Sequence, residues 1–202
     1  MSKDYSFLYK DIELPKKVLK ACDNFGEKIS TKYIAQKRNQ NSNKVNKDHA
    51  IGKKGECVVY LAFKEGMENG WVLDKPDFKI YKAKDKSWDA DLILRKGKSV
   101  KKIHIKTQEV TQSERFGLSW IFQFRNKDGK GGKDSEIFRI KDKNSFVCFV
   151  SFDNKDGIGK ICYICSVSYL LKNKLFKDPK KESLHGIKKC VYAKDIKNTL
   201  LK

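Results

Sequence analysis

The fold of this chain is decided by three segments: GKKGECVVYLAF at residues 52–63, SWDADLIL at 87–94 and KKIHIKTQ at 101–108. In the first segment, Glu56, Val59, Tyr60 and Phe63 recur at helical spacing. The other two are short apolar runs of the kind that form buried strands. The strand of the third segment is expected to run on to Val110, and further strands are expected at 71–81 with a break at Pro76, at 117–125 and at 145–152. Residues 161–176 are expected to form a strand that runs into a helix, and residues 185–202 one more short strand and a closing helix. This pattern predicts a mixed α/β fold in which helices flank a central mixed sheet.

The third segment carries an unusual residue for a core strand. Because side chains alternate along a strand, Ile103 and Ile105 face one way, while His104, Lys106 and Gln108 face the other. A lysine inside such a strand is costly to bury unless carboxylates or a metal site accompany it. The sequence therefore predicts that the carboxylates of Asp91 and Glu56 lie near this lysine. Its alternative role is that of a charge protecting an edge strand.

The composition favours a polyanionic partner. The 202 residues include 45 Lys and Arg against 25 Asp and Glu, which gives a formal charge of +20 and a pI near 9.6. An excess of this size is typical of proteins that contact phosphate backbones. The alternative is a lysine-rich composition that only adds solubilising charge. The length fits one domain with a proper core.

Several classes of protein are disfavoured by the sequence. No stretch approaches the apolar length that crosses a bilayer, and the N-terminus lacks a signal-peptide core. The six cysteines have no disulfide-framework spacing. Cys162 and Cys165 form a C-x-x-C without a second pair, so we expect structural thiols in an intracellular, reduced protein.

The first fifty residues read as a polar, helical segment. Apolar residues from Val18 to Ile34 recur at broadly helical spacing, and a polar, Asn-rich and Lys-rich stretch follows at 38–50. We interpret that stretch as a loop and expect the second helix to begin near His49. We expect residues 1–50 to pack on or extend the core and residues 51–202 to form the main domain.

The motif residues resemble those of a known family. Gly55 and Glu56 on a helix, Asp89-Ala90-Asp91 ahead of a strand and His104-Ile105-Lys106 within the next strand are similar to the PD-(D/E)xK nuclease superfamily. This group includes type II restriction endonucleases, Holliday-junction resolvases and many phage and repair nucleases. The resemblance covers about residues 52–169 and implies a restriction-endonuclease-like sheet. Each motif is short, and the agreement rests on their spacing, strand context and apolar flanks.

The resemblance implies a role for each motif residue. Asp91 matches the central metal-binding carboxylate, and Glu56 matches the helix glutamate that many members use as a second ligand. Lys106 matches the lysine that orients or deprotonates the attacking water and stabilises developing charge. Carboxylates suit Mg²⁺, and such an ion can supply hydroxide and hold the scissile phosphate. Taken alone, Asp91 is equally compatible with a turn residue and Glu56 with a solvated helix residue.

His104 departs from the family pattern, which has Asp or Glu at that position. Asp89 and Glu56 are candidates to supply the missing carboxylate as metal ligands. If His104 itself binds the metal, its imidazole favours Mn²⁺ over Mg²⁺. A structural role for His104 and a turn role for Asp89 are the alternatives.

Contacts to double-stranded DNA are expected from several residues outside the motif core. Trp120 is expected in the core by strand alternation, with stacking on a base as the alternative. The glycine-rich and lysine-rich loop at 127–133 is interpreted either as a loop that follows the DNA backbone or as a solvated surface loop. The full set of expected DNA contacts is Lys53, Lys54, Gln108, Trp120, Arg125, Lys130 and Lys133.

These features together predict a Mg²⁺-dependent DNA endonuclease of restriction type. By analogy with restriction enzymes we expect a homodimer, because symmetric cutting of two strands suits two active sites. A structure-selective or repair nuclease of the same superfamily is one alternative. A basic DNA-binding protein that keeps the fold without cleaving is the other. The sequence alone leaves the recognised DNA site open.

Overall fold

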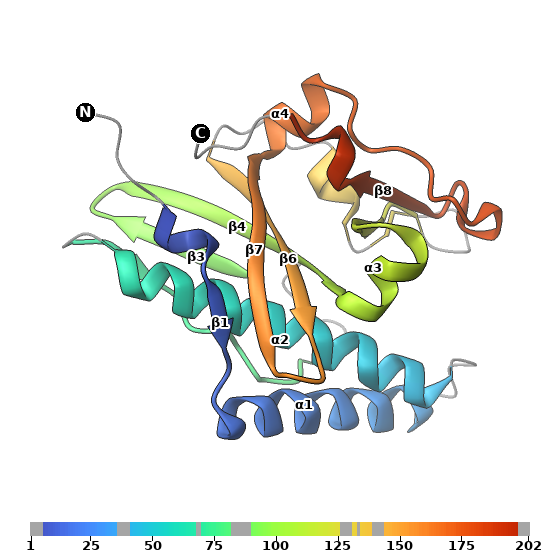
Figure 1. Cartoon of the computed structure of the whole chain (residues 1–202), viewed down its shortest axis with the longest axis horizontal. Helices are drawn as coiled ribbons and strands as arrows, with labels where there is room; N and C mark the ends of the chain where they lie inside the picture. The colour runs from blue at the N-terminus through green and yellow to red at the C-terminus, as the bar shows by residue number, and fades with distance from the viewer. Residues whose placement is uncertain are drawn as a thin grey trace.

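The computed structural model describes residues 6–35, 41–67, 70–81, 90–125, 131–132, 134–138 and 144–197. Within these ranges the chain is mixed α/β, with a curled six-stranded sheet flanked by helices, as the sequence predicts (Figure 1). The strands in spatial order are β1 (Asp11–Glu13), β7 (Ile158–Ser166), β6 (Ser145–Asp153), β4 (Ser99–Glu109), β3 (Leu92–Lys96) and β2 (Val72–Leu73). Neighbouring strands are antiparallel except β4 and β6, which run parallel.

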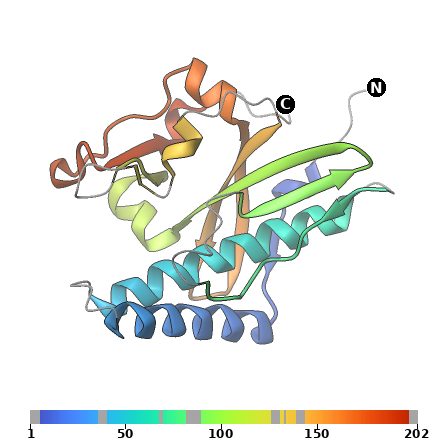
Figure 2. The same cartoon turned by 180° about the vertical axis from the view of Figure 1, so that it is seen from behind.

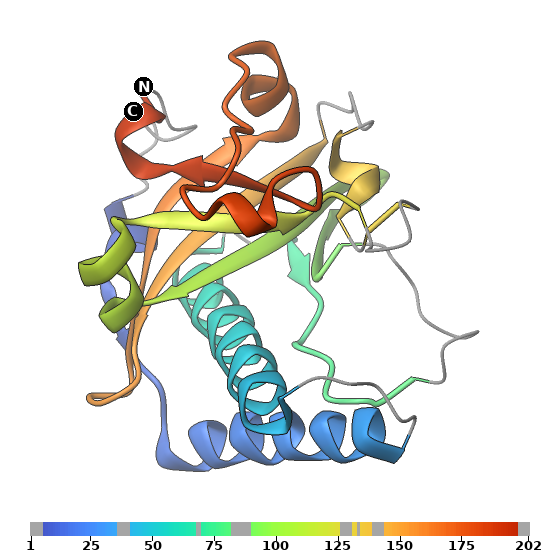
Figure 3. The same cartoon turned by 90° about the vertical axis from the view of Figure 1, so that its right-hand side faces the viewer.

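Two long helices cover one face of the sheet. α2 (Ser42–Gly66) packs against β4, β6 and β7, and α1 (Lys16–Ala35) packs against the outer side of α2 (Figure 3). The core between α2 and the sheet is formed by buried side chains from both, among them Val58, Val59, Ala62, Leu92, Ile103, Ile105, Cys148 and Val150. Burial of such side chains is the main force that holds α2 in place.

The opposite face of the sheet is covered by a second, smaller layer (Figure 2). It contains a two-stranded sheet of β5 (Ser119–Gln123) and β8 (Lys188–Tyr192), with α3 (Val110–Phe116) and α4 (Val167–Lys172) beside it. The described 3-10 helices are η1 (Ser6–Tyr9), η3 (Ser135–Phe138), η4 (Glu182–Leu184) and η5 (Ala193–Asp195). A second core, which includes Trp120, Phe122, Val147, Phe149 and Val191, fills this side.

β6 lies between these two cores, and its sequence explains why. Val147 and Phe149 face the β5–β8 layer, whereas Cys148 and Val150 face α2, and all four are fully buried. The continuous apolar run at 145–152 is therefore a strand buried on both faces, as expected for a parallel neighbour in a covered sheet.

The second helix begins earlier than the sequence analysis expects. α2 starts at Ser42 rather than near His49, inside the stretch interpreted as a loop. Asn41 is its N-cap, and the Asn41 side chain accepts a hydrogen bond from the Lys44 amide at 3.1 Å. Asparagine is a strong N-cap, so a residue that signals a loop here starts a helix. The expected boundary between residues 50 and 51 falls inside α2.

Two further expectations about secondary structure are wrong. The strand expected at 71–81 is limited to Val72–Leu73, because Pro76 cannot donate to a ladder and Asp77 bonds the Lys79 amide at 2.8 Å instead. The strand expected to continue through Val110 instead ends at Glu109, where α3 begins. Gly117 ends α3 at a φ of +79°, a conformation that glycine adopts without strain.

No helix in the described part of the chain combines the length and the apolar character needed to cross a membrane. The six cysteines are free thiols. Cys22 of α1 and Cys57 of α2 face each other, with 3.9 Å between their sulfur atoms, so they belong to the packed interface of the two long helices.

Candidate functional site

The candidate site lies where β3 separates from β4. The two strands pair from Lys96 and Ser99 as far as Leu92 and Ile103. Beyond Ile103, β6 is the only described strand that pairs with β4, so within the described residues β4 has an open edge on its β3 side. An open strand edge presents backbone amides that need partners.

Asp91 occupies this open edge. It directly precedes β3, and its Oδ2 accepts a hydrogen bond of 2.7 Å from the Ile105 amide of β4. The carboxylate thus replaces the backbone carbonyl that a longer β3 would have supplied. This hydrogen bond holds the Asp91 carboxylate beside β4, next to Ile105, the residue that precedes Lys106.

Lys106 and His104 point to the face of β4 that lies opposite α2. In the pairing of β4 with β6, His104 stands beside Val147 and Lys106 beside Phe149, both members of the core under β5. The Lys106 ammonium lies 4.9 Å from the centre of the Phe122 ring. His104 is 7% exposed, so both residues of the His-x-Lys motif are largely inside the protein.

Lys106 has a carboxylate partner that the sequence analysis did not identify. Its Nζ is 2.6 Å from Asp134 Oδ1, and the two side chains are 14% and 9% exposed. The second oxygen of Asp134 accepts a hydrogen bond from the Gln123 amide at 2.7 Å. The acid that pairs with the lysine of the core strand is thus Asp134, from the segment after β5, whereas the sequence analysis expects Asp91 and Glu56 to accompany it.

Glu56 lies on α2, the helix that packs against β4. Its neighbour Gly55 is the point of closest approach, because a Cβ built there would overlap the Thr107 side chain. The Glu56 carboxylate pairs with Lys53 at 2.6 Å, with the two side chains 14% and 8% exposed. Since Thr107 faces α2, its neighbour Lys106 faces away, so Lys106 and the helix that carries Glu56 lie on opposite faces of β4.

The motif residues therefore lie on three sides of β4: Glu56 on the helix that covers one face, Asp91 at the open edge, and His104 and Lys106 on the β5 face. Carboxylate oxygens are the donors that Mg²⁺ prefers, so Asp91 and Glu56 fit such an ion by chemistry. Among the described residues, no three His, Cys, Asp or Glu side chains come together as a metal-binding group. Asp89, the other expected ligand, lies outside the described residues.

The two lysines of α2 that were expected to contact DNA are buried. The Lys53 ammonium pairs with Glu56 and donates to the Asp77 carbonyl at 2.7 Å. Lys54 pairs with Asp23 of α1 at 2.8 Å and donates to Asn154 Oδ1 at 2.7 Å. Both side chains are less than 10% exposed, and both link α2 to neighbouring segments inside the protein.

Gln108 and Trp120 are also interior residues. Gln108 accepts from the Ser119 amide at 2.8 Å and donates to the Gly117 carbonyl at 3.3 Å, so it connects β4 to the start of β5. Trp120 is 1% exposed, and its indole donates to the Val150 carbonyl at 2.8 Å, which is the core position expected from strand alternation. In this arrangement its ring cannot stack on a base.

The other expected DNA contacts are Arg125, Lys130 and Lys133. Arg125 is exposed, with its guanidinium 5.0 Å from the centre of the Phe124 ring. Lys130 and Lys133 lie outside the described residues. Arg125 thus stays a predicted DNA contact, and its exposed position is compatible with that role.

Lys188 of β8 is a second residue near the site that the sequence did not reveal. It stands opposite Gln123 in the β5–β8 pairing, and its Nζ donates to Gln123 Oε1 at 3.0 Å. Burial lowers the pKa of Lys188, and the charge of Lys106 lowers it further, whereas Asp134 raises it. The sequence signal for Lys188 is weak, because IKK at 187–189 looks like many other lysine-rich segments of the chain.

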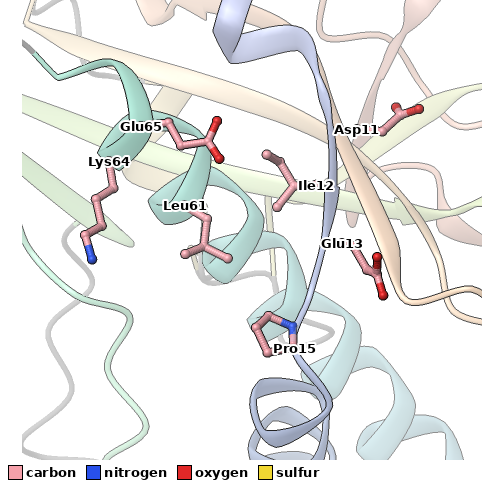
Figure 4. Close-up of a pocket in the computed structure, with 7 residues that line it drawn as sticks. All are labelled: Asp11, Ile12, Glu13, Pro15, Leu61, Lys64 and Glu65. Carbon is pink, nitrogen blue, oxygen red and sulfur yellow. The ribbon is translucent and has the colours of Figure 1, made fainter.

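A surface hollow of about 440 Å³ lies elsewhere, between β1 and the C-terminal half of α2 (Figure 4). Its lining includes the carboxylates of Asp11, Glu13 and Glu65 beside Lys64. Carboxylates disfavour a polyanion by like-charge repulsion, so this hollow does not suit a DNA backbone.

Comparison with known proteins gives no relative: no family model, no curated protein and no solved structure matches the chain.

Proposed function

We propose that this protein is a metal-dependent DNA endonuclease in which Asp91 and Lys106 carry the chemistry. The observation that carries the proposal is the Asp91 carboxylate on the open edge of β4, bonded to the Ile105 amide next to Lys106. An acid and a buried lysine are thereby fixed on adjacent parts of a central strand. This is the arrangement that the resemblance to PD-(D/E)xK nucleases implies.

Two further features support the same assignment. The order α2, β2, β3, β4, α3 and β6, with β4 parallel to β6 and a helix on each face, is compatible with a restriction-endonuclease-like sheet. The formal charge of +20 is the excess expected of a protein that binds phosphate backbones. We accordingly propose double-stranded DNA as the substrate and, by analogy with restriction enzymes, a homodimer.

In the proposed reaction, Asp91 and Glu56 would hold a divalent ion through their carboxylates. Bound there, Mg²⁺ or Mn²⁺ supplies the acidity that makes water a nucleophile at neutral pH and neutralises charge on the phosphate. Lys106 places a compact cation beside the reacting phosphate without competing for the ion. Its position at the rim of the second core excludes water from one side, which strengthens that electrostatic effect.

A second candidate is a DNA-binding protein that does not cleave. It is favoured by the ion pairs of the site, because Lys106 is held by Asp134 and Glu56 by Lys53. His104 also stands where an acid is expected. Under this alternative the charges of the site are mutually satisfied, and the basic surface alone contributes to DNA binding.

One experiment separates the candidates. The protein is incubated with supercoiled plasmid and either Mg²⁺ or Mn²⁺, and DNA binding is measured in parallel. Discrete fragments support a restriction-type enzyme, and nicking or a preference for branched DNA supports a repair-type nuclease. A gel shift without cleavage under either metal would refute the nuclease and support the binding protein.

Two variants test the residues. Asp91→Ala and Lys106→Ala should each lower cleavage by at least a hundredfold, the usual size of lost metal or charge stabilisation, while most DNA affinity remains. Near-normal cleavage by either variant at saturating metal would show that the assignment of that residue is wrong. Arg95→Ala is a suitable control, because Arg95 is an exposed cation further along β3 that pairs with Asp74 rather than with the site.

A further inference from the structure

A chain of contacts links two lysines from distant parts of the sequence. Lys106 Nζ is 2.6 Å from Asp134 Oδ1, and Asp134 Oδ2 accepts from the Gln123 amide at 2.7 Å. The Gln123 side chain accepts from Lys188 Nζ at 3.0 Å. One ammonium group is thus paired with a carboxylate, and the other is bonded to the neutral side-chain amide of the residue that this carboxylate also bonds.

The charges around Lys188 do not cancel. Lys106 and Asp134 act on it from the main sheet side, and Lys44 and Asp48 act on it from the first turns of α2. Lys44 and Asp48 pair with each other at 2.6 Å. Among the described residues, three lysines, including Lys188 itself, therefore act against two aspartates, which leaves one positive charge in excess at a half-buried position.

This surplus has a physical cost that an anion removes. Burial is the main cause of the lowered pKa of Lys188, which shows that its charged form is poorly solvated where it stands. Gln123 offers only a neutral oxygen to this ammonium. A phosphate oxygen forms a shorter, charge-assisted bond with an ammonium than a neutral amide does.

We propose that Lys188 and Lys106 together bind the DNA backbone, with Lys188 holding the phosphate adjacent to the one that Lys106 faces and Asp134 acting as their shared counterion. The proposal rests on the proposed function, because it takes Lys106 to face the reacting phosphate. It also gives the β5–β8 sheet a role in substrate binding, since β8 places Lys188 against Gln123 of β5, the residue whose amide bonds the Asp134 partner of Lys106. Lys188 is thus a binding residue supplied by the last strand of the chain.

The test uses the dependence of duplex binding on salt, measured without divalent metal so that no cleavage is involved. Lys188→Gln removes the charge and keeps a side chain of similar shape. It should reduce the slope of log K against log salt concentration by about 0.9, and affinity by about eightfold at 0.1 M salt, the values for one lost phosphate contact. Lys188→Arg keeps the charge and should keep the wild-type slope.

Lys189→Gln is the matched control. Lys189 is the next residue of β8, faces the other way, and pairs with Asp178 at 2.8 Å. It should leave the slope unchanged. Circular dichroism and the thermal midpoint of each variant establish that all three are folded.

The outcomes separate this inference from the proposed function. A wild-type slope in the folded Lys188→Gln protein, or an equal loss in Lys189→Gln, overturns the phosphate pair even if the wild-type protein cleaves DNA. A reduced slope in Lys188→Gln alone supports the pair even if the wild-type protein cuts no plasmid. An absence of duplex binding by the wild-type protein overturns both.

Discussion

The contact between α2 and β4 at Gly55 gives the sharpest test of the architecture. A Cβ built on Gly55 would overlap Thr107 Oγ1 and stand 2.9 Å from Thr107 Cβ. Gly52, three residues earlier in the same helix, has no other atom within 4 Å of such a Cβ. The substitutions Gly55→Ala and Gly52→Ala therefore make the same chemical change in one helix and differ in what the new methyl group meets.

The expected magnitudes follow from two opposing terms. Alanine in place of glycine inside a helix stabilises by about 1 kcal/mol, so Gly52→Ala should raise the free energy of unfolding by up to that amount. Overpacking at Gly55 costs about 1–3 kcal/mol. Gly55→Ala should therefore be less stable than Gly52→Ala by about 1–3 kcal/mol. For a domain of this size, the midpoints should differ by about 2–4 °C per kcal/mol.

Urea unfolding monitored by circular dichroism measures both variants. Thr107→Ala removes the overlapping oxygen, so the double variant Gly55→Ala/Thr107→Ala should recover part of the loss and be non-additive. Gly55→Ala should also lower cleavage, since any displacement of α2 moves Glu56 relative to β4. Equal unfolding free energies of Gly55→Ala and Gly52→Ala would refute the close approach and, with it, the placement of Glu56.

Three other predictions concern single side chains. His104→Glu places a carboxylate at a position that is 7% exposed, so it should lower the free energy of unfolding measured without divalent ions. If this side chain reaches the metal, Mg²⁺ should restore the free energy of unfolding, and the ratio of Mg²⁺-dependent to Mn²⁺-dependent cleavage should rise. If Mg²⁺ does not restore stability, residue 104 is not part of the metal site. Trp120→Ala should lower the free energy of unfolding in urea by about 3–5 kcal/mol, as for other large core aromatics. In the folded fraction, the salt dependence of DNA binding should stay as in the wild type, and a changed salt dependence would show that this ring contacts DNA. Cys162 is partly exposed, whereas the other five cysteines are buried, and its partial burial raises its pKa. Its thiolate fraction at pH 8 therefore lies below that of an ordinary thiol and grows as pH rises. Mass spectrometry after iodoacetamide treatment should find Cys162 modified first, at a rate that increases from pH 8 to 10, and earlier modification of another cysteine would contradict the packing.

The strands of the core were predictable because their signal is local. Alternation in KKIHIKTQ separates Ile103 and Ile105 from His104 and Lys106, and the structure places these pairs on opposite faces of β4. The apolar run at 145–152 likewise indicates a strand covered on both sides, because every side chain position must be apolar there. The start of α2 was missed because Asn41 belongs equally to loops and to helix N-caps.

The position of the acids was open to prediction only in part. Asp91 could be recognised because it precedes an apolar strand at the spacing of a known motif. Its hydrogen bond to the Ile105 amide could not be predicted, because that bond depends on where the pairing of β3 with β4 ends. Asp134 is separated from Lys106 by 28 positions and follows a glycine-rich loop without any periodic pattern. No local signal indicates that this carboxylate returns to β4.

The sequence by itself determined the α/β class, the faces of the central strands, the basic character of the chain and the candidacy of Asp91 and Lys106, because each depends on composition or on spacing along one element. Only the tertiary structure decided that Lys53 and Lys54 are buried, that Asp134 is the partner of Lys106, and that Lys188 stands beside them. Those facts depend on how the β5–β8 layer and the two long helices close over opposite faces of one sheet. Contacts between residues far apart in the chain are set by that packing, and the periodicity of side chains along one element does not indicate them.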